Sequence, residues 1–263
     1  MDFPLLIMMI ILGFIGSFFS GLLGIGGAII NYPLLLFIPS VLGIAHFSAQ
    51  EVSSISMFQV FFASLAGVIA IRKASGNNSS SLINQTLVQH MGVSILVGSL
   101  IGAFSSKYLT GEIINFIYGI LAVLAVILML VKNRGKEDAD QPLSFNKLLA
   151  TSIAFGVGIV SGIVGAGGAF ILIPIMLTVL KIPTRVTIAS SLAIVFLSAI
   201  GGVLGKLTAG HIPLMPTLFT IVGSLLGAPF GARTSARINV QALRYGLVVI
   251  ISFTAVKIWM DLL

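Results

Sequence analysis

The chain has 263 residues, of which 57% are hydrophobic and only 8% charged, and it carries a formal net charge of +7. Soluble globular proteins are about a quarter charged because their surfaces face water, so this composition excludes a soluble domain and predicts an exterior in contact with lipid. Lys and Arg in short cytoplasmic loops account for a positive balance in a membrane protein, so we do not expect nucleic acid as a partner. The lack of Cys excludes disulfides and thiolate metal sites.

Eight apolar runs predict an all-α polytopic integral membrane protein. None of them alternates as a barrel strand would, and a helix that crosses the bilayer needs about 20 apolar residues. The first run has no basic region before it, so we take it as a membrane segment rather than a cleaved signal peptide. The runs span residues 4–38, 49–71, 87–106, 113–131, 148–180, 186–205, 212–230 and 240–260.

The two longest runs, 4–38 and 148–180, are too long for one simple crossing, and glycines interrupt each of them. Between them, the hydrophilic stretch 132–147 divides the chain into an N-terminal repeat, 1–131, and a C-terminal repeat, 148–263. We expect this stretch to be a cytoplasmic linker between two transmembrane repeats.

The two halves share four sequence blocks in the same order, which indicates an internal duplication. Ser20–Ala28 recurs as Ser161–Ala169, and Val97–Ala103 recurs as Val222–Ala228. Shared order across several blocks is hard to produce by chance, even in a low-diversity apolar sequence. The other matched blocks are Ser53–Ser54 with Ser190–Ser191 and Tyr118–Gly119 with Tyr245–Gly246.

The positions of Lys and Arg distinguish parallel from inverted repeats. If each of the longest runs crosses once, the cations divide almost evenly between the two sides of the membrane. If each run folds back at its glycines, only Lys107, Lys206 and Lys257 lie outside, in agreement with the positive-inside rule. Arms of about 16 residues would each span roughly 24 Å of helix. We therefore predict inverted repeats with glycine-broken, re-entrant or hairpin first helices, about ten membrane segments and both termini outside.

The strongest motif is the duplicated glycine-rich segment, Gly21–Gly27 and Gly162–Gly168, each followed by a proline, Pro33 or Pro174. Backbone groups left unsatisfied at membrane depth are costly, so such a break is tolerated where it is buried or lines a cavity. Amides at the start of the following half-helix favour an anion. Close packing of helices is the alternative interpretation, but the duplication and the loop charges favour a site. A dinucleotide-binding loop is excluded by the glycine spacing and by the lack of a preceding strand.

A second candidate feature is a pair of serines in each half, Ser53–Ser54 and Ser190–Ser191. Capping explains one serine, whereas consecutive serines in both repeats favour hydroxyls that line a site. Gln59 suits equally a site or a bridge between helices. Glu51 is the acid nearest to these elements, and we expect it to be interfacial and solvated, with proton coupling as the alternative.

No metal-site spacing, nucleophile–base pair or carboxylate pair is present, so we expect no metal, no cofactor and no enzyme. Close helix packing is expected at Gly98, Gly102, Gly223, Gly227 and Gly231.

These motifs resemble the sulfite exporter TauE/SafE family, also called the toluene-sulfonate uptake permease family. The resemblance lies in the duplicated Gly-x-Gly-Gly with its following proline, in Ala189–Leu192 and in Gly223–Ala228, and it extends over residues 1–263. It implies a multi-pass plasma-membrane (inner-membrane) transporter of small sulfur-containing anions in a bacterium or archaeon. Serines replace the usual threonines, and Ala28 and Ala169 replace a usual third glycine, so the identity of the anion stays open. Carried over by position, the implied site is Gly24, Gly26, Gly27, Ser53, Ser54, Gly165, Gly167, Gly168, Ser190 and Ser191.

We therefore expect a transporter that exports sulfite, thiosulfate or sulfoacetate by alternating access at a site near the bilayer midplane. An inside-negative potential favours anion exit by about 2.3 kcal/mol per charge per 100 mV, so export needs no coupling ion. The alternatives are an anion channel, a proton- or sodium-coupled uptake permease for organosulfonates, and a scaffold whose glycines only pack helices. The expected partners are a small anionic substrate and the lipid bilayer, and the sequence leaves open whether the chain forms a homo-oligomer.

Overall fold

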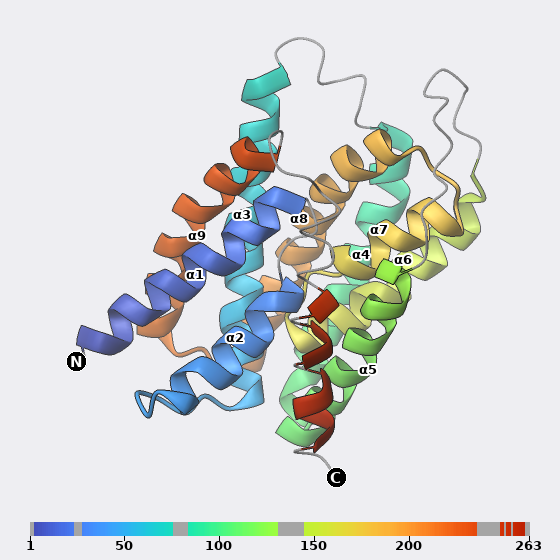
Figure 1. Ribbon diagram of the computed structural model, residues 1–263. Coiled ribbons are helices and arrows are strands. Elements are labelled where there is room, and N and C mark those ends of the chain that lie inside the picture. The colour runs from blue at the N-terminus through green and yellow to red at the C-terminus, as the bar shows by residue number, and fades with distance from the viewer. Residues whose placement is uncertain are drawn as a thin grey trace.

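The computed structural model shows a helical bundle in which no strand occurs among the described residues (Figure 1). These are residues 3–23, 28–75, 84–130, 145–235, 248–249, 251–253 and 255–260. Six helices in this part of the chain are long and apolar enough to cross a membrane. Four shorter apolar helices accompany them, the last of which is Ile251–Met260. The predicted all-α polytopic architecture is thus confirmed, whereas the predicted number of membrane segments stays a prediction.

Both of the longest apolar runs form two helices that are separated at the glycine-rich segment. The first run forms α1 (Phe3–Leu23) and α2 (Ala28–Val41), and the second forms α6 (Lys147–Val164) and α7 (Ala169–Thr178). The remaining elements are α3 (Ala49–Ser75), α4 (Gln85–Ser105), the short 3-10 helix η2 (Ser106–Tyr108), α5 (Gly111–Leu130), α8 (Thr184–Ala209) and α9 (Leu214–Ser235). Most of the predicted linker lies outside the described residues, and α6 begins at its last residue, Lys147.

The two arms of each broken run are unequal, which corrects the expectation of arms with about 16 residues. The arms have 21 and 14 residues in the first run and 18 and 10 residues in the second. In both runs the first helix continues into the glycine cluster, to Leu23 and to Val164, so the break lies past the centre of the run. At 1.5 Å per residue, α1 therefore spans roughly 31 Å, enough to cross a bilayer, whereas α7 spans only roughly 15 Å.

Helices of the two halves are interlocked through glycines. A Cβ added at Gly223, Gly227 or Gly231 of α9 would overlap the backbone of α1, at Ile10, Phe14 and Phe18 respectively. Later glycines of α9 contact later residues of α1, so the two helices run parallel and side by side (Figure 1). In the same way Gly98 and Gly102 of α4 press against Phe155 and Ile159 of α6. The glycines spaced by four therefore form close helix contacts, as predicted.

Helices α3 and α8, which carry the matched serine pairs, cross each other in opposite directions. Gly67, late in α3, lies against Leu192, early in α8. Gly202, late in α8, lies against Met57, early in α3. The contacts thus occur in opposite order along the two helices, so α3 and α8 are antiparallel.

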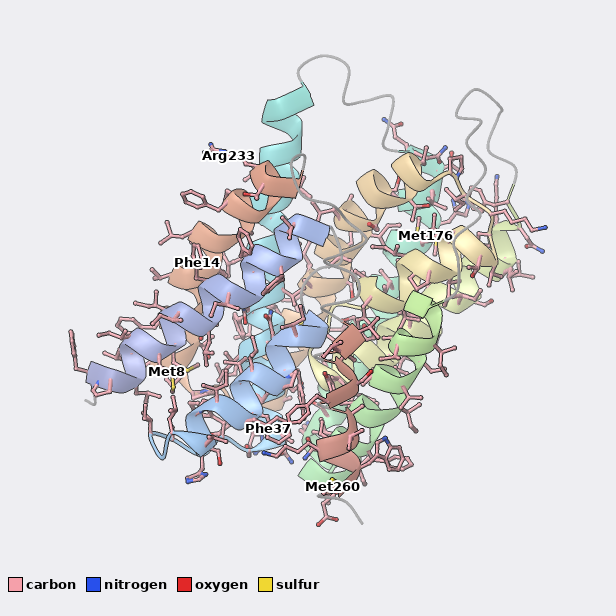
Figure 2. The ribbon with its side chains drawn as sticks, viewed as in Figure 1. Met8, Phe14, Phe37, Met176, Arg233 and Met260 are labelled. Carbon is pink, nitrogen blue, oxygen red and sulfur yellow. The ribbon has the colours of Figure 1, made fainter. Side chains whose placement is uncertain are left out.

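The outer surface is apolar, and many of the polar side chains are inside. Large exposed side chains include Phe3, 72% exposed, and Phe253, 73% exposed. Figure 2 shows side chains projecting outward along the bundle, with Phe14 on α1 and Arg233 at the end of α9. Serines and threonines are buried between the helices, together with Asn31, Gln59 and Lys206. This arrangement suits a protein surrounded by lipid, since lipid cannot satisfy polar groups.

Candidate functional site

The second glycine-rich segment forms a left-handed turn between α6 and α7. Gly165, Gly167 and Gly168 have backbone φ values of +79°, +65° and +79°, which residues with a side chain rarely adopt. The amides of Gly165 and Ala166 both donate to the Ser161 carbonyl, at 2.8 and 2.9 Å. The helix therefore ends in an αL cap, and glycine is required at these positions for the chain to reverse.

This break is buried where α3 and α8 cross. Every residue from 161 to 170 is buried. A Cβ on Gly165 would overlap the backbone carbonyl of Ser53, and a Cβ on Gly167 would lie 2.6 Å from Val60 Cγ1 and 3.4 Å from Val195 Cγ1. The predicted residues Gly165, Gly167, Gly168 and Ser53 thus lie together in one place.

The carbonyl of Ile163, at the end of α6, accepts hydrogen bonds from two side chains of other helices. Ser53 Oγ donates to it at 2.6 Å and Lys206 Nζ at 3.2 Å. The ammonium also donates to Ser106 Oγ at 2.7 Å, and that hydroxyl donates to the Ala103 carbonyl. The break is therefore tied to α3, α8 and η2 by polar contacts.

Lys206 is a functional candidate that the sequence reasoning missed, because the count of loop charges placed it outside the membrane. The side chain is only 1% exposed, and no carboxylate among the described residues pairs with it. The partial negative charge at the C-terminal end of α6 compensates part of this buried charge. The signal in the sequence was Gly201 and Gly205, whose spacing predicts that this end of α8 packs tightly against another helix.

The two serine pairs do not meet in one pocket. Ser54 Oγ donates to the Gln50 carbonyl of its own helix, and Ser190 Oγ accepts from the Asn84 amide at 3.2 Å. Ser191 is fully buried as well. Because α3 and α8 are antiparallel, Ser53 and Ser190 lie near opposite ends of their contact, roughly 20 Å apart along the helices. Binding of a ligand by both pairs stays a prediction.

Gln59 bridges α3 to α1. Its Nε2 donates to the Gly13 carbonyl at 3.1 Å and to Ser17 Oγ at 3.2 Å, and the side chain is 1% exposed. A buried asparagine of α2, Asn31, lies beside it and was not singled out in the sequence. The predicted bridging role is therefore present, and a polar cluster surrounds it.

Glu51 caps the start of α3. Its Oε2 accepts from the Ser48 amide at 2.8 Å and from Ser48 Oγ at 3.0 Å, and its own amide donates back to Ser48 Oγ at 3.3 Å. These reciprocal bonds form a capping box. They account for Glu51 without a proton-coupling role, which stays a prediction.

Three predicted residues, Gly24, Gly26 and Gly27, lie outside the described part of the chain. Within that part, no group of three or more His, Asp or Glu side chains could hold a metal ion.

Comparisons with known proteins identify relatives along nearly the whole chain. Residues 9–258 match the family described as Sulfite exporter TauE/SafE. A Bacillus subtilis (strain 168) relative named "Probable membrane transporter protein YunE" is 25% identical over 255 residues, which cover 90% of this chain and 91% of the relative. A Methanocaldococcus jannaschii relative, also named a "Probable membrane transporter protein", is 26% identical over 250 residues, with 91% and 90% covered. A Xylella fastidiosa (strain Temecula1) relative with the same description is 28% identical over 249 residues, with 90% and 89% covered. No solved structure matches the chain.

Proposed function

The chain belongs to the sulfite exporter TauE/SafE family of membrane transporters, and we propose that it exports small sulfur-containing oxyanions by alternating access. The proposed substrates are sulfite, thiosulfate and sulfoacetate. The relatives are named as membrane transporters and not as enzymes, so the proposal concerns the cargo and the mechanism rather than a reaction.

The observation that carries this proposal is the buried glycine turn between α6 and α7. Gly165, Gly167 and Gly168 place a helix end and a helix start in the interior of an apolar bundle. The start of α7 presents backbone amides with partial positive charge, a common way to hold an anion without a charged side chain. Half-helices that end near the bilayer midplane are a recurring substrate site in secondary transporters.

The antiparallel crossing of α3 and α8 supports inverted repeats. Alternating access in such transporters exchanges the roles of two halves that face opposite sides of the membrane. With hairpin first runs, the positive-inside rule then places the linker in the cytoplasm and both termini outside the plasma membrane.

Export without a coupling ion is supported by the positions of the acids. Among the described residues these are Glu51 and Glu112, and each lies in the first turn of a helix. Neither lies deep in a membrane-spanning segment, where a proton relay would need it. The inside-negative potential alone favours the exit of an anion.

Flux measurements on proteoliposomes containing the purified full chain test the proposal. Sulfite, thiosulfate and sulfoacetate are loaded separately, and efflux is followed with and without an imposed potential. Saturable efflux that the potential accelerates is expected for an exporter. Currents far above carrier turnover would indicate a channel, and no flux of any of these anions would overturn the proposal.

Gly167→Leu tests whether the break carries this activity. The side chain would collide with Val60, so efflux should be lost, while Gly156→Leu, at an exposed helical position with nothing within 4 Å of a Cβ, should leave it unchanged. Equal efflux in both variants would show that export does not depend on the glycine turn.

A further inference from the structure

Asn31 has an unusual environment for a polar side chain inside an apolar bundle. It lies in the first turn of α2 and is only 2% exposed, yet neither its Nδ2 nor its Oδ1 has a hydrogen-bond partner. The Oε1 of Gln59 also lacks a partner. Buried amides without partners are destabilising, so they are retained where a ligand or another function requires them.

These unpaired atoms belong to one cluster built from three helices. A Cβ on Gly16 of α1 would overlap Asn31 Oδ1 and would lie 2.9 Å from Gln59 Nε2. The same Nε2 donates to Ser17 Oγ, so Ser17, Asn31 and Gln59 converge beside Gly16. We call these three residues the amide cluster. Gly16 precedes the end of α1 by about two helical turns, roughly 10 Å, so the amide cluster lies near the first glycine-rich segment.

The fold does not require polar groups at these positions. The register that matches Ser20–Ala28 with Ser161–Ala169, and Pro33 with Pro174, sets Asn31 against Leu172. Leu172 is fully buried in an apolar cluster to which both repeats contribute. The same register sets Gly16 against Val157. Gly16 leaves space that the Asn31 side chain occupies, whereas in the second repeat a valine side chain stands at this position. The polarity is therefore specific to the first repeat.

We propose that the amide cluster binds the oxygen atoms of the transported oxyanion, an inference that rests on the proposed function. Asn31 Nδ2, which has no partner, and Ser17 Oγ, which accepts from Gln59 Nε2, can donate to an oxyanion, and the N/O orientation of Asn31 adjusts to the ligand. The first backbone amides of α2 have no partner within the helix and carry partial positive charge beside Asn31. This charge favours an anion over a sodium ion, which the amide oxygen atoms would otherwise suit. A neutral site also lets the anion leave again, since no fixed cation holds it.

Asn31→Leu is the decisive variant, because it installs the residue that the second repeat has at the matched position. Removing two unpaired polar atoms should leave the melting temperature in detergent unchanged or raised. Sulfite should raise the melting temperature of the unchanged protein, and Asn31→Leu should lose this shift. Efflux of sulfite from proteoliposomes should fall about tenfold to a hundredfold, as expected when a hydrogen bond to a charged group is lost.

A second, matched pair of variants acts without altering the amide. Gly16→Ala displaces the Asn31 side chain and should reduce sulfite binding and efflux, whereas Gly156→Ala places the same methyl group in open space and should change neither. This pair keeps the inference falsifiable if Asn31→Leu folds poorly.

The outcomes separate this inference from the proposed function. Normal efflux and a normal sulfite shift in Asn31→Leu and Gly16→Ala would overturn the amide cluster and leave the exporter intact. A lowered melting temperature of Asn31→Leu, with normal efflux in Gly16→Ala, would show that Asn31 is structural. A shift caused by sodium chloride but not by choline sulfite would identify a cation site instead. No binding and no efflux of any tested anion by the unchanged protein would overturn both proposals.

Discussion

Gly167→Ala measures how tightly the second glycine turn is packed. An alanine with φ near +65° costs about 1–2 kcal/mol of backbone strain. Its Cβ would lie 2.6 Å from Val60 Cγ1, and overpacking of this kind typically costs about 1–3 kcal/mol more. We therefore expect Gly167→Ala to lower the free energy of unfolding by about 2–5 kcal/mol.

The matched control is Gly43→Ala, because Gly43 has the same φ of +65° but nothing within 4 Å of its added Cβ. It should cost only the strain, about 1–2 kcal/mol. Reversible unfolding of both variants in detergent micelles, titrated with a denaturing surfactant, gives the difference. Equal costs for the two variants would refute the close packing of Gly167 against α3, and with it the buried break.

Five further variants test the contacts around the break and at the start of α3. Ser53→Ala should cost about 1 kcal/mol, because Lys206 still donates to the Ile163 carbonyl. Lys206→Met should change the free energy of unfolding by less than about 2 kcal/mol, since relief of the buried charge offsets the lost hydrogen bonds; a loss above about 4 kcal/mol would contradict this. The double variant leaves that carbonyl unpaired, so a double-mutant cycle should show a cost greater than the sum, and strict additivity would argue against a shared acceptor. Glu51→Ala should cost about 1 kcal/mol while Glu51→Gln keeps the capping box, and both should export sulfite normally. Loss of efflux in Glu51→Gln would support proton coupling instead.

The glycine patterns were the most informative part of the sequence because backbone geometry determines their meaning locally. The density of glycines before Ala169 predicts a broken helix, and the turn at Gly165–Gly168 has the left-handed conformations that only glycine adopts readily. The spacing of Gly223, Gly227 and Gly231 predicts a face that another backbone approaches closely. The lengths of the two arms were predicted less well, because an apolar run shows where helix is possible and not where it ends.

Long-range partners could not be predicted, because a glycine-lined face shows that a helix packs there but not which helix, and the other apolar faces suit lipid and protein alike. Nothing in the sequence indicates that α1 packs against α9, which comes from the other half. The burial of Lys206 and Asn31 depends on such contacts. From the sequence, Lys206 is expected at the membrane interface, because it lies three residues before the end of its helix; its burial results from contacts with α4 and η2. Asn31 follows a glycine cluster, where a helix cap is expected; it is buried because Gly16 leaves space for its side chain.

The two repeats differ more in their buried polar side chains than in the arrangement of their helices. Both repeats contain the same glycine-rich block, and the helix pairs α1–α9 and α4–α6 are built from matched glycines. At the second break, Ser53 and Lys206 both bond the Ile163 carbonyl, so that helix end is neutralised by the protein itself. In the first repeat, Asn31 and Gln59 keep unpaired atoms. If the amide cluster binds the anion, the first repeat adds side-chain donors to the site, whereas in the second repeat the backbone amides at the start of α7 act alone. Binding of the anion would then pair side-chain atoms that are unpaired without it, and a conformation that strengthens these contacts would be favoured when the anion is bound.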